Sequence, residues 1–88
     1  MNGINQKIWT QELTNSTLLI TEDFGLSSIS LVLKSGTGSV DGTLTLENSV
    51  PSTPINLAVG IPLTITGYTA LDGISIVTTG VISIIGKQ

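Results

Sequence analysis

The carboxylates are the first side chains in this chain whose chemistry needs to be considered. A glycosidase needs two carboxylates that face each other across a cleft, and a calcium site needs several closely spaced oxygen ligands. Only Glu22 and Asp23 are adjacent here, and the other acidic residues fall singly in predicted turns and strand ends. We therefore expect no metal site and no catalytic carboxylate pair. The six acidic residues are Glu12, Glu22, Asp23, Asp41, Glu47 and Asp72.

The sequence also lacks the residues that nucleophilic catalysis usually requires. Serine and threonine make up 23 of the 88 residues, but the chain contains no histidine and no cysteine. A serine nucleophile needs a neighbouring base, and only Lys7, Lys34 or Lys87 are available for that role. Gly36-Thr37-Gly38 is an isolated G-x-G that precedes a predicted strand, whereas a phosphate-binding loop precedes a helix. We expect no catalytic residues, no cofactor and no enzymatic activity.

The charge balance excludes two classes of partner. The net charge is −3, the three basic residues are all lysines, and there is no arginine. Binding to nucleic acid requires clustered basic residues that neutralise phosphates, so neither nucleic acid nor an anionic membrane surface is an expected partner. No apolar run approaches the length of a spanning helix, and the N-terminal ten residues lack the apolar core of a signal peptide.

Hydrophobic residues make up 40% of the chain, and charged residues only 10%. A chain of this length folds as one domain with a modest core, which cannot easily bury so much apolar surface. We expect part of that surface to be buried between chains, in a homo-oligomer.

The chain has three aromatic residues, Trp9, Phe24 and Tyr68. Exposed aromatic rings on one face of a β-sandwich can stack against sugars, so Trp9 and Tyr68 allow a small carbohydrate platform. Aromatic side chains also serve as anchors in cores and interfaces, and we favour this second interpretation. Both alternatives stay open on the sequence alone.

Apolar residues alternate with polar ones in several short segments, which is typical of half-buried β-strands. Glycine-centred turns separate four such segments between Ile55 and Ile85. We predict a hairpin loop at residues 35–38 and a bulge or tight turn at Asp41-Gly42. Pro62 lacks an N–H group, which predicts an edge or a bulge in its strand. Further strands are expected at residues 17–21, 27–34 and 43–47, followed by a loop at residues 48–54.

About eight short strands at this spacing predict an all-β fold, a small antiparallel β-sandwich or jelly roll. Residues 1–14 are expected to be an N-terminal arm or a first strand, and residues 15–88 the β-sandwich domain. The apolar residues Ile4, Ile8 and Trp9 stand in an otherwise polar segment. We predict that these three residues, together with Tyr68, form an interface.

One stretch of the chain resembles a known group of proteins. It runs from the short strand Gly42-Thr43-Leu44-Thr45-Leu46 through Gly60-Ile61-Pro62-Leu63 to the segment Gly67-Tyr68-Thr69-Ala70-Leu71-Asp72-Gly73 and its following strand. This order is similar to that of the short β-sandwich virion proteins of tailed bacteriophages and gene transfer agents. Those proteins form head spike bases, head fibres and capsid decorations. The resemblance covers less than half of the chain.

The resemblance implies a non-enzymatic structural protein of a virion that assembles as a trimer or another symmetric oligomer, the trimer being favoured, and contacts other virion proteins, such as the major capsid protein. It transfers no catalytic residue. The alternative from the aromatic residues is a small carbohydrate- or surface-binding module.

Overall fold

The structure of the chain is a computed structural model that describes residues 7–42 and 54–88. These residues form eight β-strands and one turn of 3-10 helix, which confirms the predicted all-β fold class. The strand predicted at residues 43–47 and most of the loop that follows it lie outside the described residues. Within the described ranges, no helix is long and apolar enough to cross a membrane. The elements are β1 (Ile8–Thr14), β2 (Thr17–Ile20), η1 (Glu22–Phe24), β3 (Ser28–Ser35), β4 (Gly38–Gly42), β5 (Ile55–Asn56), β6 (Leu63–Thr66), β7 (Ile74–Thr78) and β8 (Val81–Lys87).

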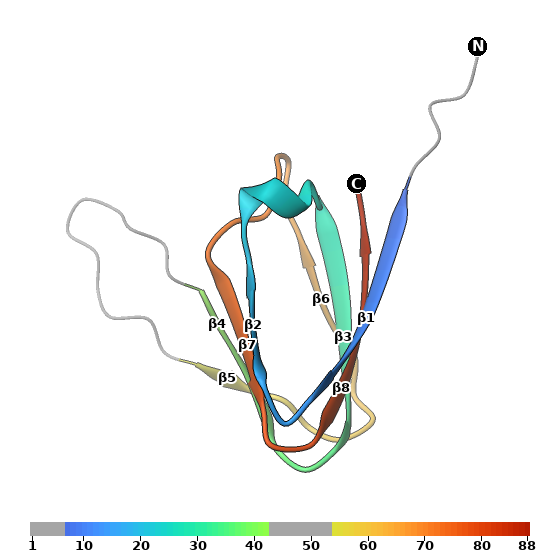
Figure 1. Cartoon of the computed structure of the whole chain (residues 1–88), viewed down its shortest axis with the longest axis vertical. Helices are drawn as coiled ribbons and strands as arrows, with labels where there is room; N and C mark the ends of the chain where they lie inside the picture. Colours follow the sequence, from blue (N-terminus) through green and yellow to red (C-terminus); the bar gives the residue numbers. More distant parts are fainter. Residues whose placement is uncertain (1–6, 43–53) are drawn as a thin grey trace, which may run out of the picture.

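The eight strands form two four-stranded antiparallel sheets. Sheet A has the strand order β1-β8-β3-β6, and sheet B has the order β2-β7-β4-β5. Figure 1 shows the two sheets as facing layers that converge at the end where the chain turns from β1 to β2, from β3 to β4 and from β7 to β8. This strand order is that of a jelly roll, the double-sheet form of the β-sandwich.

The core lies between the two sheets. In each strand, residues of alternate position point to the same face, and in this chain the inward positions are aliphatic. Ile29, Leu31 and Leu33 of β3 are all buried, as are Ile82 and Ile84 of β8. Sheet B contributes Ile20, Val40, Ile74 and Ile76 from the opposite side, and the remaining buried members are Leu13, Leu26 and Leu71.

The first described residues belong to this sandwich. β1 pairs with β8 over seven positions, from Ile8 opposite Lys87 to Thr14 opposite Val81. Leu13 points into the core and is 4% exposed. β8 itself lies between β1 and β3, so the C-terminal strand is internal to its sheet.

Two local expectations differ from the structure. Asp41 and Gly42 continue β4 opposite Ser75 and Ile74, and form neither a bulge nor a tight turn. The carbonyl and N–H groups of β7 bond to this segment, which holds it extended. Pro62 lies in no strand: β6 begins directly after it, at Leu63, and forms the outer edge of sheet A.

The predicted hairpin at residues 35–38 is wrong. β3 pairs with β6 and β8, whereas β4 pairs with β5 and β7 in the other sheet. The connection therefore crosses from one sheet to the other. Leu33 and Val40 lie on opposite sides of this turn and both point into the core, which requires that their strands face each other. A short glycine turn serves a hairpin and a crossing connection equally well.

Three tight connections of this crossing type lie together at the convergent end of the sandwich (Figure 1). They join β1 to β2, β3 to β4 and β7 to β8. The β7–β8 connection, which contains Gly80, lies between the other two. The carbonyl of Gly80 accepts a hydrogen bond from the N–H of Asn15, in the β1–β2 connection, at 2.8 Å. On its other side, the N–H of Thr79 donates to the carbonyl of Thr37 at 3.0 Å.

Hydroxyl groups complete the bonding between these connections. The hydroxyl of Thr78, which is buried, donates to the carbonyl of Thr37 at 2.8 Å and accepts from the N–H of Gly80 at 2.9 Å. The hydroxyls of Thr37 and Thr79 lie 2.7 Å apart. Because buried polar groups are costly without partners, these bonds stabilise the crossing geometry.

Glycine is required where these connections touch. A Cβ atom on Gly80 would lie 1.9 Å from the carbonyl oxygen of Ser35 and 2.8 Å from the Cα atom of Gly36. Gly36 also has a φ of +74°, a conformation that side-chain-bearing residues rarely adopt. The close backbone approach therefore depends on both glycines.

We expect Gly80→Ala to lower the free energy of unfolding by about 3 kcal/mol, because the methyl group would force two backbone segments apart. Urea denaturation monitored by circular dichroism measures this loss. Gly42→Ala is the matched control, because no described atom lies within 4 Å of its Cβ position. A Gly80→Ala protein as stable as the control would contradict the packing described here.

Candidate functional site

The outward-facing side of sheet A carries short and uncharged side chains over most of its area. We call this surface the outer face of sheet A. Its rows follow the strand register: Thr10 of β1, Ile85 of β8, Ser30 of β3 and Thr64 of β6 lie side by side. The other members are Ile8, Glu12 and Thr14 on β1, Val81, Ser83 and Lys87 on β8, Ser28, Val32 and Lys34 on β3, and Thr66 on β6.

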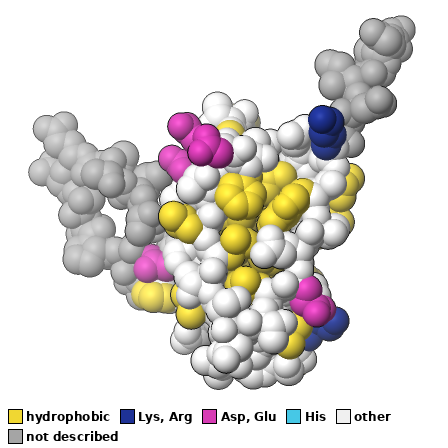
Figure 2. Space-filling model, viewed as in Figure 1, with side chains coloured by type: hydrophobic (Ala, Val, Ile, Leu, Met, Phe, Trp, Pro, Cys, Tyr) yellow, Lys and Arg dark blue, Asp and Glu magenta, His cyan; other side chains and the backbone are white. Residues whose placement is uncertain are grey.

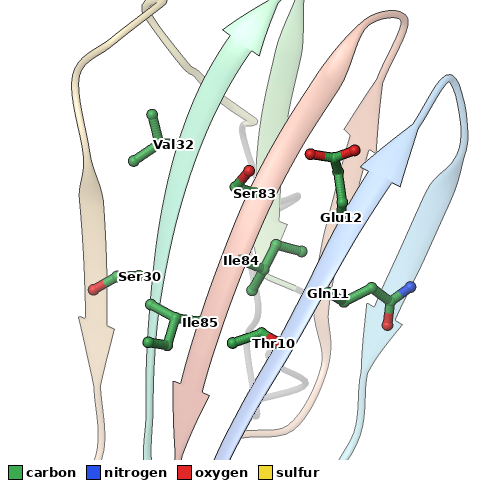
Figure 3. A pocket seen from close by; sticks show the side chains of 8 residues that line it. All are labelled: Thr10, Gln11, Glu12, Ser30, Val32, Ser83, Ile84 and Ile85. Atoms are coloured by element: carbon green, nitrogen blue, oxygen red, sulfur yellow. The ribbon is translucent and has the colours of Figure 1, made fainter.

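A shallow hollow of about 470 Å³ lies on this face. In Figure 3 its side chains project from three adjacent strands, β1, β8 and β3. On the outward side of β8, Ser83 lies between the larger side chains of Val81 and Ile85. Its short side chain leaves a depression in the middle of the sheet. The lining residues are Thr10, Gln11, Glu12, Ser30, Val32, Ser83, Ile84 and Ile85.

A second hollow of about 160 Å³ lies beside the first and shares Ser30 and Ile85 with it. Its remaining lining residues are Ile8, Ser28 and Lys87. Ile85 therefore stands between the two hollows. Its side chain is 49% exposed, and that of Ile8 beside the smaller hollow is 56% exposed.

The face carries the charged residues Glu12, Lys34 and Lys87, of which Glu12 lines the larger hollow. At one end, the Lys34 Nζ atom and the Glu12 Oε2 atom are 3.2 Å apart. Lys34 belongs to β3 and Glu12 to β1, so this ion pair reaches across the central strand β8. Both side chains are more than half exposed, and such a pair contributes at most about 1 kcal/mol. Lys87 lies at the other end, in the row of Ile8 and Ser28.

Hydroxyl pairs connect β3 to the edge strand β6 on the same face. The Ser30 and Thr64 hydroxyls lie 2.9 Å apart, and those of Ser28 and Thr66 lie 3.5 Å apart. Cross-strand pairs of this kind stabilise a sheet. They also give these four hydroxyls partners within the sheet, so that a partner can cover them without leaving them unbonded.

The residues that line the larger hollow can make van der Waals contacts and hydrogen bonds. Glu12 is its one ionisable lining residue, and its carboxylate is paired with Lys34. The other polar lining groups are three hydroxyls and the amide of Gln11. In the described part of the chain, no group of three or more acidic residues is placed to hold a metal ion. The arrangement suits the docking of aliphatic side chains against Val32 and Ile85.

The four residues predicted to form an interface lie in different environments. Ile8 lies on the outer face of sheet A, and Ile4 lies outside the described residues. Trp9 points the opposite way and packs against the core. Tyr68, in the loop between β6 and β7, is fully exposed.

Trp9 also contacts the only other aromatic ring near it among the described residues. Its ring lies 5.6 Å from that of Phe24 at an interplanar angle of 90°, an edge-to-face geometry that adds to the energy of burial. Phe24 belongs to η1, which Gly25 ends at a φ of +66°. Trp9 thus helps to cover the core at the end of the sandwich where η1 lies.

Other exposed aliphatic residues lie outside this face. Leu19 and Val77 are on the outer face of sheet B, while Ile55, Val59 and Ile61 lie in β5 and the connection to β6. Figure 2 shows hydrophobic side chains between the two sheets at one edge of the sandwich. Alternation between residues 55 and 66 predicts strands with their apolar side chains on a core face, which is wrong for Ile55, Val59 and Ile61: only Ile55–Asn56 and Leu63–Thr66 of this stretch are strands, and these three side chains are exposed.

Comparisons with protein-family models, with curated proteins and with solved structures gave no match to this chain.

We expect Phe24→Ala to lower the free energy of unfolding by about 2 kcal/mol, since a half-buried aromatic contact is lost. The chain has a single tryptophan, so its fluorescence reports on this contact directly. The emission maximum of Trp9 should shift to longer wavelength in the folded variant. Tyr68→Ala is the control and should change neither quantity, because Tyr68 is fully exposed. An unchanged Trp9 spectrum in Phe24→Ala would refute the contact.

Proposed function

We propose that this chain is a non-enzymatic structural protein of a phage-like virion, a capsid decoration, head fibre or spike subunit that assembles through apolar β-face contacts. The observation that carries the proposal is the outer face of sheet A, whose centre holds short hydroxyl and aliphatic side chains and two hollows. The proposed partners are further copies of the chain and other virion proteins, such as the major capsid protein.

Three properties of the molecule support a role in assembly. Glu12 and Lys34, two of the charged side chains of this face, are paired with each other, and the hydroxyls of Ser30 and Thr64 bond to each other. Covering the centre therefore leaves few polar groups without partners, which is the condition for a favourable interface. The jelly roll is, in addition, a fold that viral capsid proteins and lectins both use.

This proposal predicts that the chain is found on particles. An antibody against the purified chain should detect it in phage-like particles banded on a density gradient from the producing cells. Its ratio to the major capsid protein should stay constant after a second gradient. An unrelated soluble protein of the same cells serves as the control for trapping. A chain that remains wholly in the soluble fraction would refute the proposal.

A carbohydrate- or surface-binding module is the second candidate, and the exposure of Tyr68 favours it. A ring that is fully exposed on a loop is available for stacking against a sugar. The ring of Trp9 is not exposed in the same way for stacking against a sugar, because it packs against the core and Phe24.

If this second candidate holds, Tyr68→Ala should lower glycan affinity at least tenfold, because one stacking contact is lost. A glycan array followed by calorimetry measures this effect. Ile61→Ala, an exposed residue in another loop, is the matched control and should leave glycan affinity unchanged. An array without a hit would rule the candidate out.

A further inference from the structure

The hydrogen bonds at the two ends of β1 show which of its backbone groups are free. The N–H of Asn15 donates to the carbonyl of Gly80, and the N–H of Gln88 donates to the carbonyl of Lys7. In an antiparallel pair, residues whose backbone groups face the partner strand alternate with residues whose groups point away from it. The odd-numbered residues of β1 therefore bond to β8. The even-numbered residues present their N–H and carbonyl groups at the outer edge of sheet A, and these are Ile8, Thr10, Glu12 and Thr14.

The other three sheet edges are protected in ways that β1 is not. A free edge invites pairing with another chain, and proteins limit this with short edge strands, prolines, bulges or charges. β2 and β6 have four residues each and β5 has two, and Pro62 directly precedes β6. β1 has seven residues without a proline, and its register with β8 is unbroken. Its one charged side chain, Glu12, is paired with Lys34. Among the described strands, β1 is therefore the edge best suited to bind a further strand.

Partly exposed apolar side chains lie along the same side of the sandwich. Figure 1 views the molecule onto the edges formed by β1 and β2, and Figure 2, in the same view, shows hydrophobic side chains between the two sheets. Trp9, Leu18 and Phe24 pack against the core but are only partly buried. A strand added to β1 would remove apolar surface from water as well as bond to the free backbone groups.

We infer that β1 pairs in antiparallel fashion with β1 of a second copy of this chain, which joins the two copies of sheet A into one sheet of eight strands. The twofold axis passes at Gln11. Ile8 of each copy then lies opposite Thr14 of the other, and Thr10 opposite Glu12. This register uses every free backbone group of β1 and forms about eight hydrogen bonds. The inference goes beyond the proposed function, which concerns the outer face of sheet A, and does not depend on it.

The occupant of this edge follows from the symmetry of β1 itself. A twofold axis places the same strand on both sides of the contact, so β1 must offer its free groups at matching positions on either side of one residue. It does so about Gln11, because the four edge residues lie one and three positions away on each side. No like charges meet, since Glu12 lies opposite Thr10. On the inner side Trp9 of each copy lies opposite Leu13 of the other, an aromatic–aliphatic pair of the kind that stabilises a sheet.

Neighbouring registers are less favourable. A shift of the axis by half a residue sets the free edge groups against groups that already bond to β8, so no new hydrogen bonds form. A shift of one residue toward the C-terminus places Glu12 opposite Glu12, and like charges directly opposite are destabilising. A shift of one residue toward the N-terminus leaves Thr14 without a partner in β1. The sequence of β1 therefore selects a single register.

Proline at an edge-facing position tests the pairing, with sedimentation velocity of the purified full chain over a range of concentrations as the measurement. We expect the unaltered chain to form a reversible dimer. We expect Thr10→Pro to weaken dimerisation at least tenfold, because proline has no N–H to donate to the second copy. The N–H of Thr10 points away from β8, so bonding within the sheet is kept.

The other edge of sheet A offers the matched control. The N–H of Gly67 donates to the carbonyl of Ser27, so by the same alternation Thr64 of β6 also presents its N–H away from its sheet. Thr64→Pro should leave dimerisation unchanged. Denaturation curves of both variants establish that each is folded.

Amide hydrogen exchange of the unaltered chain is a second test that needs no variant. The amides of Thr10 and Glu12 should exchange at least tenfold more slowly at high than at low protein concentration, because they are bonded only in the dimer. The amides of Gln11 and Leu13 face β8 and should be protected at both concentrations. The amide of Thr64 is the control and should not respond to concentration. Exchange at Thr10 and Glu12 that is independent of concentration would contradict the pairing.

The position of the axis is tested by disulfide formation, since the chain has no cysteine of its own. The two copies of Gln11 form a non-hydrogen-bonded pair with Cα atoms about 4.5 Å apart, a distance that a disulfide can bridge. With oxidised glutathione as the oxidant, Gln11→Cys protein should form a linked dimer faster than Tyr68→Cys protein, whose fully exposed position reports random collision. Equal rates would overturn the register. A monomer at every concentration, or a dimer insensitive to Thr10→Pro, would overturn the inference altogether.

These outcomes are separable from a failure of the proposed function. A chain that is monomeric in solution yet bands with particles would refute the pairing of β1 and leave the virion role intact. A chain that dimerises through β1 but is absent from particles would do the reverse.

Discussion

The architecture depends on a close approach of two backbone segments at Gly36 and Gly80. These glycines lie in connections that pass from one sheet to the other, and no side chain fits between them. The contact brings the β3–β4 and β7–β8 connections together, with the β1–β2 connection bonded alongside through Asn15. Because each connection links facing strands, their association sets which strand of sheet A lies opposite which strand of sheet B.

The hollow on sheet A is a consequence of this arrangement and of the choice of residues on β8. A central strand usually benefits from large β-branched residues, and β8 has them at its inward positions, Ile82 and Ile84. On its outward side the serine at position 83 interrupts this pattern. The long side chains of Glu12 and Lys34 reach across the strand near that serine and give the recess a charged boundary on that side.

Alternation of apolar residues was sufficient to predict most of the strands and their inward faces. Ile29, Leu31 and Leu33 are buried as the pattern of β3 indicates. The pattern did not reveal which strands pair. It failed at residues 35–38, because a glycine turn permits both a hairpin and a crossing, and only the burial of Leu33 and Val40 from opposite sheets decides between them.

The candidate site was less predictable than the fold. Ile8 was singled out from its local composition and lies on the outer face of sheet A. Nothing in the sequence near Ser83, Ser30 or Thr10 indicates that they line one hollow, because β8, β3 and β1 become neighbours only through pairing of distant segments. The direction of Trp9 was similarly open, since an extended segment offers either face to the core.

The pairing pattern has a consequence for how the chain reaches this structure. The described strands β1, β3, β6 and β8 of sheet A are never paired with their immediate neighbour in sequence, and Ile8 meets Lys87 almost a full chain length away. Loop-closure entropy must be lost before such contacts contribute any stability. The chain therefore has a high relative contact order, and we expect it to fold in milliseconds to seconds. During that interval the unpaired strands are exposed, and the scarcity of charge offers little protection against association with other unfolded copies.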